Sequence, residues 1–269
     1  MVLKLAILNL SPDSFSDGDP AMLEPELALT RVQELLTQGA NYIDIGAEST
    51  RPGASPVSTE EELARLTPFL ETLSAEGLAL KGRFSLDTGN SQVVRKVFKE
   101  YGQYFNFIND VSGMQNNNML GIIREFVNPN TRLISMHSKG GVPPRQTSAE
   151  IPDDFYKHGL LEDLKVFWDR TISQMRRFEI DSSRLILDPG LGFGKNLKHS
   201  LEIINLIAKL KEEFGVPVLI GASRKSFLKL WRNKADASNQ ELDEWTQEYN
   251  SMAVKAGADL IRVHYDKIN

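Results

Sequence analysis

The chain has 269 residues, a net charge of −5 and no cysteine. The lack of cysteine excludes a disulfide scaffold and thiol catalysis, and it fits a reducing compartment. No run of about 18 apolar residues is present, and the negative charge argues against general nucleic-acid binding. We therefore expect a globular, cytoplasmic protein with neither a membrane nor a nucleic-acid partner.

Segments with strand and helix patterns alternate along the chain. Short apolar runs that end in polar or glycine residues predict strands, and longer runs with apolar residues at helical spacing predict helices. The predicted strands are 4–10, 41–46, 82–87, 104–110, 132–136, 184–188, 216–221 and 259–263. The predicted helices are 24–38, 60–74, 91–101, 117–127, 155–178 and 198–213, followed by a helical region with a polar insertion over 224–256.

This alternation predicts a parallel sheet, because parallel strands need crossover connections. Eight strands in a chain of this length predict a single α/β domain over residues 1–269, a (β/α)8 TIM barrel. A doubly wound open sheet is the alternative. Only five residues follow His264, so we allow for a barrel without its eighth helix, or one whose open edge another chain covers.

Nearly every predicted strand ends in polar residues. The active site of this barrel type forms at the carboxyl ends of the strands. One polar residue at a strand end usually belongs to a turn, but its recurrence on all the strands favours a shared site. The residues at these ends are Asn9, Asp13, Glu48, Ser49, Thr50, Arg51, Asp87, Asn109, Asp110, His137, Asp188, Ser223, Arg224, Lys225, Ser226, Arg262 and His264.

Three of these residues suit a ligand that is rich in N–H donors. Asp87, Asn109 and Asp188 offer carboxylate and amide oxygens at strand ends, which fits an aminopyrimidine or pterin ring. The alternative is that each side chain caps a neighbouring loop.

Cationic residues at the same end predict an anionic ligand. They would meet a phosphate or pyrophosphate, since guanidinium groups match phosphate oxygens. The alternative is that they are solvated charges paired with nearby acids. The cationic residues are Arg51, Arg224, Lys225, Arg262 and His264.

Two further features concern metal and phosphate binding. Asn9 and Asp13 offer oxygen ligands that suit Mg²⁺ held mainly through phosphate oxygens. Residues 185–195 (LILDPGLGFGK) lead from a strand into three glycines and a lysine. This segment fails the nucleotide P-loop pattern, because Pro189 and Asn196 stand where glycine and Ser/Thr are required.

The motifs at these strand ends resemble those of the dihydropteroate synthases, a pterin-binding family. Residues 9–18 (NLSPDSFSDG) and 44–53 (DIGAESTRPG) resemble the first two family signatures, which are highly specific. The resemblance extends from about residue 7 to residue 264 and implies a TIM barrel. The other matching motifs are 85–88 (SLDT), 108–110 (IND), 188–195 (DPGLGFGK), 223–226 (SRKS) and 262–264 (RVH).

The resemblance implies a transferase of folate biosynthesis and a sulfonamide target. In an Mg²⁺-dependent condensation, 4-aminobenzoate would displace pyrophosphate from 6-hydroxymethyl-7,8-dihydropterin pyrophosphate. Loops 11–20 and 47–58 would close over the substrates and exclude water. By position, the resemblance implies catalytic roles for Asp87, Lys225, Arg51 and Asp13, pterin binding by Asp87, Asn109, Asp188 and Lys225, 4-aminobenzoate binding by Thr50, Arg51, Pro52, Phe193 and Ser226, pyrophosphate binding by Asn9, Arg262 and His264, and a metal at Asn9.

The sequence also departs from the family pattern. Asp19 and Ala47 replace usual glycines, loop 137–141 (HSKGG) is altered, and residues 233–250 lack the usual motif. A pterin-binding methyltransferase of the same superfamily and a catalytically silent pterin-binding module are the alternatives. The family also suggests a homodimer, and some members are fused to the pterin pyrophosphokinase that precedes them in the pathway.

Overall fold

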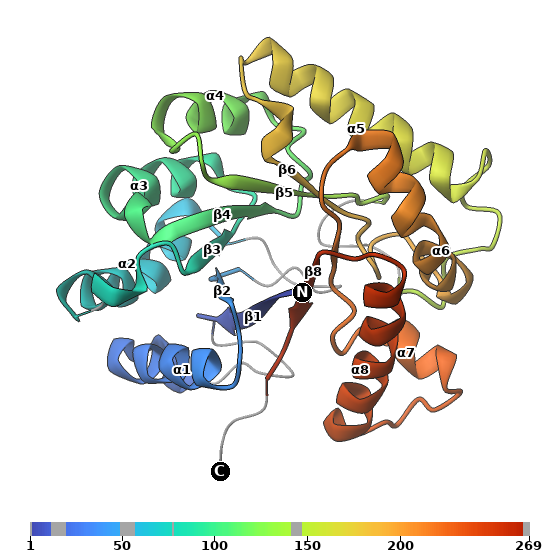
Figure 1. The fold of residues 1–269 in the computed structure, drawn as a ribbon. Coiled ribbons are helices and arrows are strands. Elements are labelled where there is room, and N and C mark those ends of the chain that lie inside the picture. Colours follow the sequence, from blue (N-terminus) through green and yellow to red (C-terminus); the bar gives the residue numbers. More distant parts are fainter. Residues whose placement is uncertain (1, 12–19, 49–56, 77, 141–146, 266–269) are drawn as a thin grey trace.

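Parallel strands form a nearly closed barrel in the computed structural model, which describes residues 2–11, 20–48, 57–76, 78–140 and 147–265. Eight strands pair in the order β6-β5-β4-β3-β2-β1-β8-β7. A bridge between Leu187 and Val218 joins the two ends of this series. The strands lie at the centre of the molecule and the helices surround them (Figure 1). The prediction of a TIM barrel is therefore confirmed, and the open-sheet alternative is excluded.

The strands match the predicted segments to within a few residues. Their bounds are β1 (Leu3–Asn9), β2 (Tyr42–Gly46), β3 (Phe84–Asp87), β4 (Phe105–Asp110), β5 (Arg132–Met136), β6 (Leu185–Asp188), β7 (Leu219–Ile220) and β8 (Leu260–Val263). The largest difference is β7, which is much shorter than the predicted 216–221. Pro217 has no backbone N–H to donate to a neighbouring strand, although its carbonyl oxygen accepts from the Leu187 N–H at 2.9 Å. The barrel therefore closes between β6 and β7 through few hydrogen bonds.

Helices follow the first six strands as predicted. Their bounds are α1 (Pro25–Thr37), α2 (Thr59–Glu76), α3 (Ser91–Tyr101), α4 (Asn117–Phe126), α5 (Leu160–Arg177) and α6 (Leu197–Phe214). The start of α5 was predicted too early, at residue 155. Gly159 precedes the helix with φ +90°, a conformation that ends helical geometry and suits glycine.

The predicted helical region 224–256 consists of two helices, α7 (Ser226–Trp231) and α8 (Asn239–Lys255). Ser238 caps α8 in a capping box with Glu241, which explains why the polar insertion ends there. Both helices precede β8 in the chain. The described residues end at Tyr265, shortly after β8, and include no helix beyond that strand.

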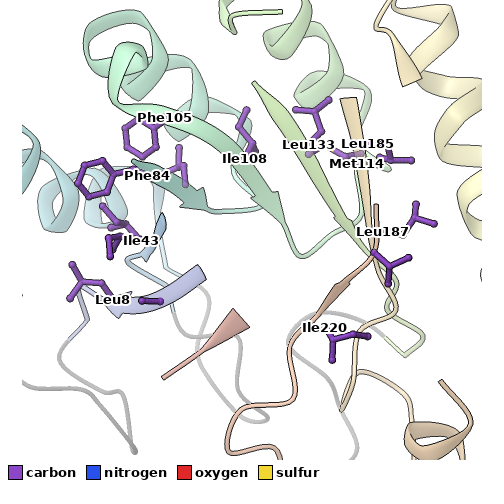
Figure 2. Packing of buried hydrophobic residues seen from close by; sticks show 14 of the residues in the cluster. Leu8, Ile43, Phe84, Phe105, Ile108, Met114, Leu133, Leu185, Leu187 and Ile220 are labelled. Carbon is purple, nitrogen blue, oxygen red and sulfur yellow. The ribbon is translucent and has the colours of Figure 1, made fainter. Parts of the chain in front are cut away.

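Apolar side chains fill both faces of the barrel wall. The larger cluster lies between the strands and the helices, and Figure 2 shows residues such as Phe84, Phe105 and Leu133 packed there. A smaller cluster fills the interior towards the amino ends of the strands and consists of Leu5, Phe107, Ile134, Ile186, Leu219 and Leu260. This apolar floor leaves the carboxyl half of the interior to polar residues.

Across the described part of the chain, no helix combines the length and the apolar composition that crossing a bilayer requires.

The packing of α5 predicts a contrast between two of its residues. Leu164 is fully buried and Val166 is 60% exposed. Leu164→Ala should lower the free energy of unfolding by about 2–5 kcal/mol, because the substitution leaves a cavity. Val166→Ala should change it by less than about 0.5 kcal/mol. Urea unfolding of both variants measures the contrast, and equal losses would show that α5 packs with a different face.

Candidate active site

Polar residues lie at the carboxyl ends of three of the four adjacent strands β1 to β4. Asn9 on β1 is in register with Gly46 on β2, Gly46 with Asp87 on β3, and Asp87 with Asn109 on β4. Asp188 ends β6, beside Met136 of β5. The structure thus brings the residues predicted to bind a pterin to one end of the barrel, as the strand-end pattern indicates.

Arg262 of β8 crosses the barrel interior to two carboxylates. Its Nε lies 2.5 Å from Asp44 Oδ2, and its terminal nitrogen lies 2.5 Å from Asp87 Oδ2. Asn109 Nδ2 also donates to Asp44 Oδ2, at 3.1 Å. Arg262 therefore links β8 to β2 and β3, and Asn109 joins the same cluster.

Asp44 was absent from the predicted site residues. Its side chain is fully buried, and its Oδ1 has no hydrogen-bond partner within the described residues. The signal was present in the sequence, because an acid inside the apolar segment NYIDIG has no structural reason to be buried unless a cation meets it.

Burial and charge shift the pKa values of this cluster. Burial raises the pKa of Asp87 to about 7, with Asp44 and Glu62 adding to the rise and Arg262 opposing it. Burial also raises the pKa of Asp188, against the Gly190 N–H and Lys225. Burial works against the charge of Arg262, yet Asp44 and Asp87 together hold its pKa above the ordinary value. Perturbed carboxylates at one end of a barrel are typical of a functional site.

The glycine segment after β6 passes close to the end of β5. Asp188 Oδ1 accepts the Gly190 N–H at 2.8 Å. Gly190 has φ +67°, and a Cβ at this position would lie 2.0 Å from the His137 carbonyl oxygen, so only glycine fits. Further along, the ring of Phe193 lies 4.3 Å from Lys225 Nζ. The segment is therefore a close crossing of two loops, consistent with its failure to match a P-loop.

Arg224 does not contribute to the predicted cationic group. Its guanidinium forms a two-pronged ion pair with Asp243 of α8, at 2.7 and 2.6 Å. Its backbone has φ +53°, and its N–H donates to Thr246 Oγ1 at 3.2 Å. Arg224 thus anchors the start of α7 to α8. Region 233–250, whose function the sequence left open, supplies this anchor.

Two other predicted residues lie near hydroxyl groups. His264 Nδ1 is 3.0 Å from Ser223 Oγ, which also accepts the His264 backbone N–H at 3.1 Å. Ser226, at the start of α7, donates to Ser148 Oγ at 3.3 Å. Five other predicted residues lie outside the described residues, namely Asp13, Ser49, Thr50, Arg51 and Pro52.

The described residues contain no group of three or more His, Asp or Glu side chains that could hold a metal ion. The amide oxygen of Asn9, at the end of β1, fits a Mg²⁺ ion whose other ligands are phosphate oxygens and water.

Comparison with known proteins assigns the family. A sequence profile described as "Pterin binding enzyme" matches residues 5–264. The chain belongs to this pterin-binding enzyme family. The match confirms the resemblance that the motifs indicate, and it covers strands β2 to β8 and most of β1.

Relatives in the pterin-binding family include two kinds of protein. The folate synthesis bifunctional protein of Arabidopsis thaliana is 33% identical over an alignment of 271 positions. The alignment covers 97% of this chain and 53% of that protein. The dihydropteroate synthase of Synechocystis sp. is 32% identical, with 97% of this chain and 84% of that protein covered. The chain thus spans about half the length of the plant bifunctional relatives and most of the length of the cyanobacterial one.

A solved structure of the family has the same fold. The dihydropteroate synthase of Yersinia pestis, in complex with a sulfonamide drug, superimposes with a TM-score of 0.84 at 32% identity. The superposition covers 98% of this chain and 89% of that chain.

The raised pKa of Asp87 predicts a pH effect on stability. Its pKa is 3.8 in the unfolded reference and about 7 in the folded protein. Between these values the folded state holds a proton that the unfolded chain has released, so the free energy of unfolding falls as the pH rises. Asp87→Asn should therefore make the decline of the melting temperature between about pH 4 and pH 7 shallower.

Asp181→Asn is the matched control for this measurement. The pKa of Asp181 is lowered by the Ser183 N–H, so its contribution is lost only under more acidic conditions. An unchanged slope in Asp87→Asn would show that Asp87 does not titrate in this range.

Proposed function

We propose that this chain is a dihydropteroate synthase. The enzyme would join 4-aminobenzoate to 6-hydroxymethyl-7,8-dihydropterin pyrophosphate and release pyrophosphate, a step of folate biosynthesis. The observation that carries the proposal is the cluster of Asp87, Asn109 and Asp188 at the carboxyl end of the barrel. The relatives that this chain covers over most of their length, such as the one from Synechocystis sp., are dihydropteroate synthases.

The pterin would bind through its N–H groups. Asp188 is a buried acid and Asp87 is a largely buried one, their carboxylate oxygens accept such donors, and Asn109 adds an amide. Burial strengthens these hydrogen bonds, because the local dielectric constant is lower than that of water. Lys225, held beside the ring of Phe193, would donate to a pterin acceptor on the same side.

The pyrophosphate would lie over β1 and β8. Arg262 and His264 extend from the end of β8 and would donate to its oxygens, and Asn9 ends the neighbouring strand. Asn9 would also hold the Mg²⁺ ion through its side-chain oxygen. When bound, this ion takes up negative charge that develops on the leaving oxygen.

The reaction is a direct displacement that needs no enzyme nucleophile. The amine nitrogen of 4-aminobenzoate forms a bond to the methylene carbon of the pterin, and the carbon–oxygen bond to pyrophosphate breaks. The electron pair leaves with pyrophosphate, and the amine loses one proton to it or to water. The methylene carbon gains positive charge as the leaving group departs, and the carboxylate of Asp87 would stabilise that charge.

The other substrate and the closing loops involve residues at the edge of the barrel. Phe193 and Ser226 would contact 4-aminobenzoate together with Thr50, Arg51 and Pro52. Arg51 and Asp13 would complete the catalytic site when loops 11–20 and 47–58 exclude water. The Yersinia pestis relative binds a sulfonamide drug, and we propose that sulfonamides compete with 4-aminobenzoate here.

Three properties of the whole protein belong to the same proposal. The enzyme would act in the cytoplasm and as a homodimer. It would also work beside, or fused to, the pterin pyrophosphokinase that supplies its substrate, since the matching plant proteins are bifunctional.

The proposed activity predicts a defined product. With the pterin pyrophosphate, 4-aminobenzoate and Mg²⁺, the protein should form dihydropteroate and release one pyrophosphate per product, and chelation of the metal should stop both. Chromatography and a coupled pyrophosphate assay measure the two products. Pterin binding without product would favour a silent module, and methyl transfer from a methylated folate would favour the methyltransferase alternative.

Asp188→Asn tests the pterin site separately from folding. The asparagine keeps an oxygen that can accept the Gly190 N–H, but it replaces the second oxygen with an NH₂ group that cannot accept from the pterin. Pterin affinity should fall about 10- to 100-fold with little change in melting temperature. Asp181→Asn, before the other end of the same strand, is the control and should bind normally. Normal affinity of Asp188→Asn, measured by calorimetry, would overturn the assignment.

A further inference from the structure

Lys195 is a fully buried lysine at the end of the glycine segment. Its Nζ lies 2.9 Å from His137 Nδ1, 3.1 Å from the Phe193 carbonyl oxygen and 3.4 Å from the His137 carbonyl oxygen. These three neighbours match the three N–H donors of an ammonium group. Burial lowers the pKa of Lys195 to about 7, with Asp188 and Asp163 opposing the shift and Lys139 and Lys225 adding to it. A lysine in such a place costs stability, so its retention calls for a specific role.

His137 connects this lysine to an acid on α5. Its Nε2 lies 2.9 Å from Asp163 Oδ1, and Lys139 Nζ lies 2.5 Å from Asp163 Oδ2. Burial, together with Lys195, lowers the pKa of His137 to about 4, so the imidazole is neutral at pH 7. The neutral ring therefore donates from Nε2 to Asp163 and accepts at Nδ1 from Lys195. In this series of hydrogen bonds, Lys195 donates to His137 and His137 donates to Asp163.

The loops after β5 and β6 are packed backbone against backbone at this point. A Cβ on Gly194 would lie 2.0 Å from the Lys139 carbonyl oxygen, which is as close as the approach of Gly190 to His137. The hydroxyl of Tyr156 donates to the Gly194 carbonyl oxygen at 2.8 Å. Lys195 adds a buried side-chain link beneath these contact points, because its Nζ donates to the carbonyl oxygens of His137 and Phe193.

Phe193 lies on the segment that this lysine holds. Its side chain is buried, and its ring contacts Lys225 Nζ. The carbonyl group of the same residue accepts from Lys195. A shift of this carbonyl would carry the ring with it, and the ammonium group of Lys225 would lose its packing surface.

We propose that Lys195 is a positioning residue of the active site. By donating to the Phe193 and His137 carbonyl groups it fixes the ring of Phe193, and through that ring it fixes Lys225. The expected loss of kcat/KM rests on the proposed synthase function. The expected position of the Phe193 ring does not depend on that function.

The kinetic test is a double-mutant cycle. Lys195→Met should lower kcat/KM for 4-aminobenzoate about 10- to 100-fold, as small misplacements of catalytic groups do. Because Lys195 acts through Phe193, the Lys195→Met/Phe193→Ala variant should lose no more than Phe193→Ala alone. Losses that multiply in the double variant would overturn the proposal. Lys211→Met, which removes a lysine paired with Asp259 on the outside of the barrel, is the matched control and should keep normal kinetics.

Two substitutions of His137 keep the test informative if Lys195→Met fails to fold. His137→Asn retains an oxygen near the position of Nδ1 and should keep most of the activity, whereas His137→Leu removes one of the three acceptors of Lys195 and should lower kcat/KM in the same direction as Lys195→Met, by a smaller factor. Equal effects of the two would contradict the proposed role of the Lys195 contact.

Crystal structures separate this inference from the proposed function. In Lys195→Met the Phe193 ring should move away from Lys225 Nζ, compared with the wild-type protein, whether or not dihydropteroate forms. An unchanged ring position would refute the positioning role even in an active enzyme. If the ring is displaced in Lys195→Met but the wild-type protein forms no product, only the synthase proposal is refuted.

Discussion

The ion pairs of Arg262 with Asp44 and Asp87 are the interaction on which the polar half of the barrel depends. Two carboxylates inside a barrel repel each other and are poorly hydrated, and a cation between them offsets both effects. The guanidinium supplies that cation and two fixed hydrogen-bond directions. It also joins β8 to β2 and β3 across the interior. A site built in this way is already charged and oriented before a substrate arrives.

The second half of the barrel is organised by backbone contacts between loops and by one ion pair. The loops after β5 and β6 touch at Gly190 and Gly194, where any other residue would collide with a carbonyl group. The Arg224–Asp243 pair holds the start of α7 to α8 in a similar way. The loop contacts position Phe193, and the ion pair positions Lys225, which follows Arg224 in the chain. Phe193 and Lys225 contact each other. The weak closure between β6 and β7 therefore lies beside a part of the structure that is tightly held by its loops.

The sequence predicted most of the fold because its signals are local. Apolar runs, capping residues and glycines mark each strand and helix, and alternation implies a parallel barrel. The predicted bounds were wrong where a single proline or glycine interrupts the local pattern. Strand β7 is short because Pro217 cannot donate within a sheet, and α5 begins late because Gly159 adopts a left-handed conformation. Among the polar residues, position at a strand end placed Asp87, Asn109 and Asp188 correctly.

The amino-acid sequence by itself determined the family, the barrel, and the end of the barrel at which polar residues gather, since each of these follows from motifs and from the order of elements. Only the tertiary structure decided which charges meet. Arg224 and Arg262 look equivalent in the sequence, yet one pairs with α8 and the other spans the interior between Asp44 and Asp87. Lys195 likewise follows a glycine-rich segment in the sequence, and only the structure shows that it is buried against His137. Such pairings join residues far apart in the chain, and their energies depend on distance and burial, which no local pattern records.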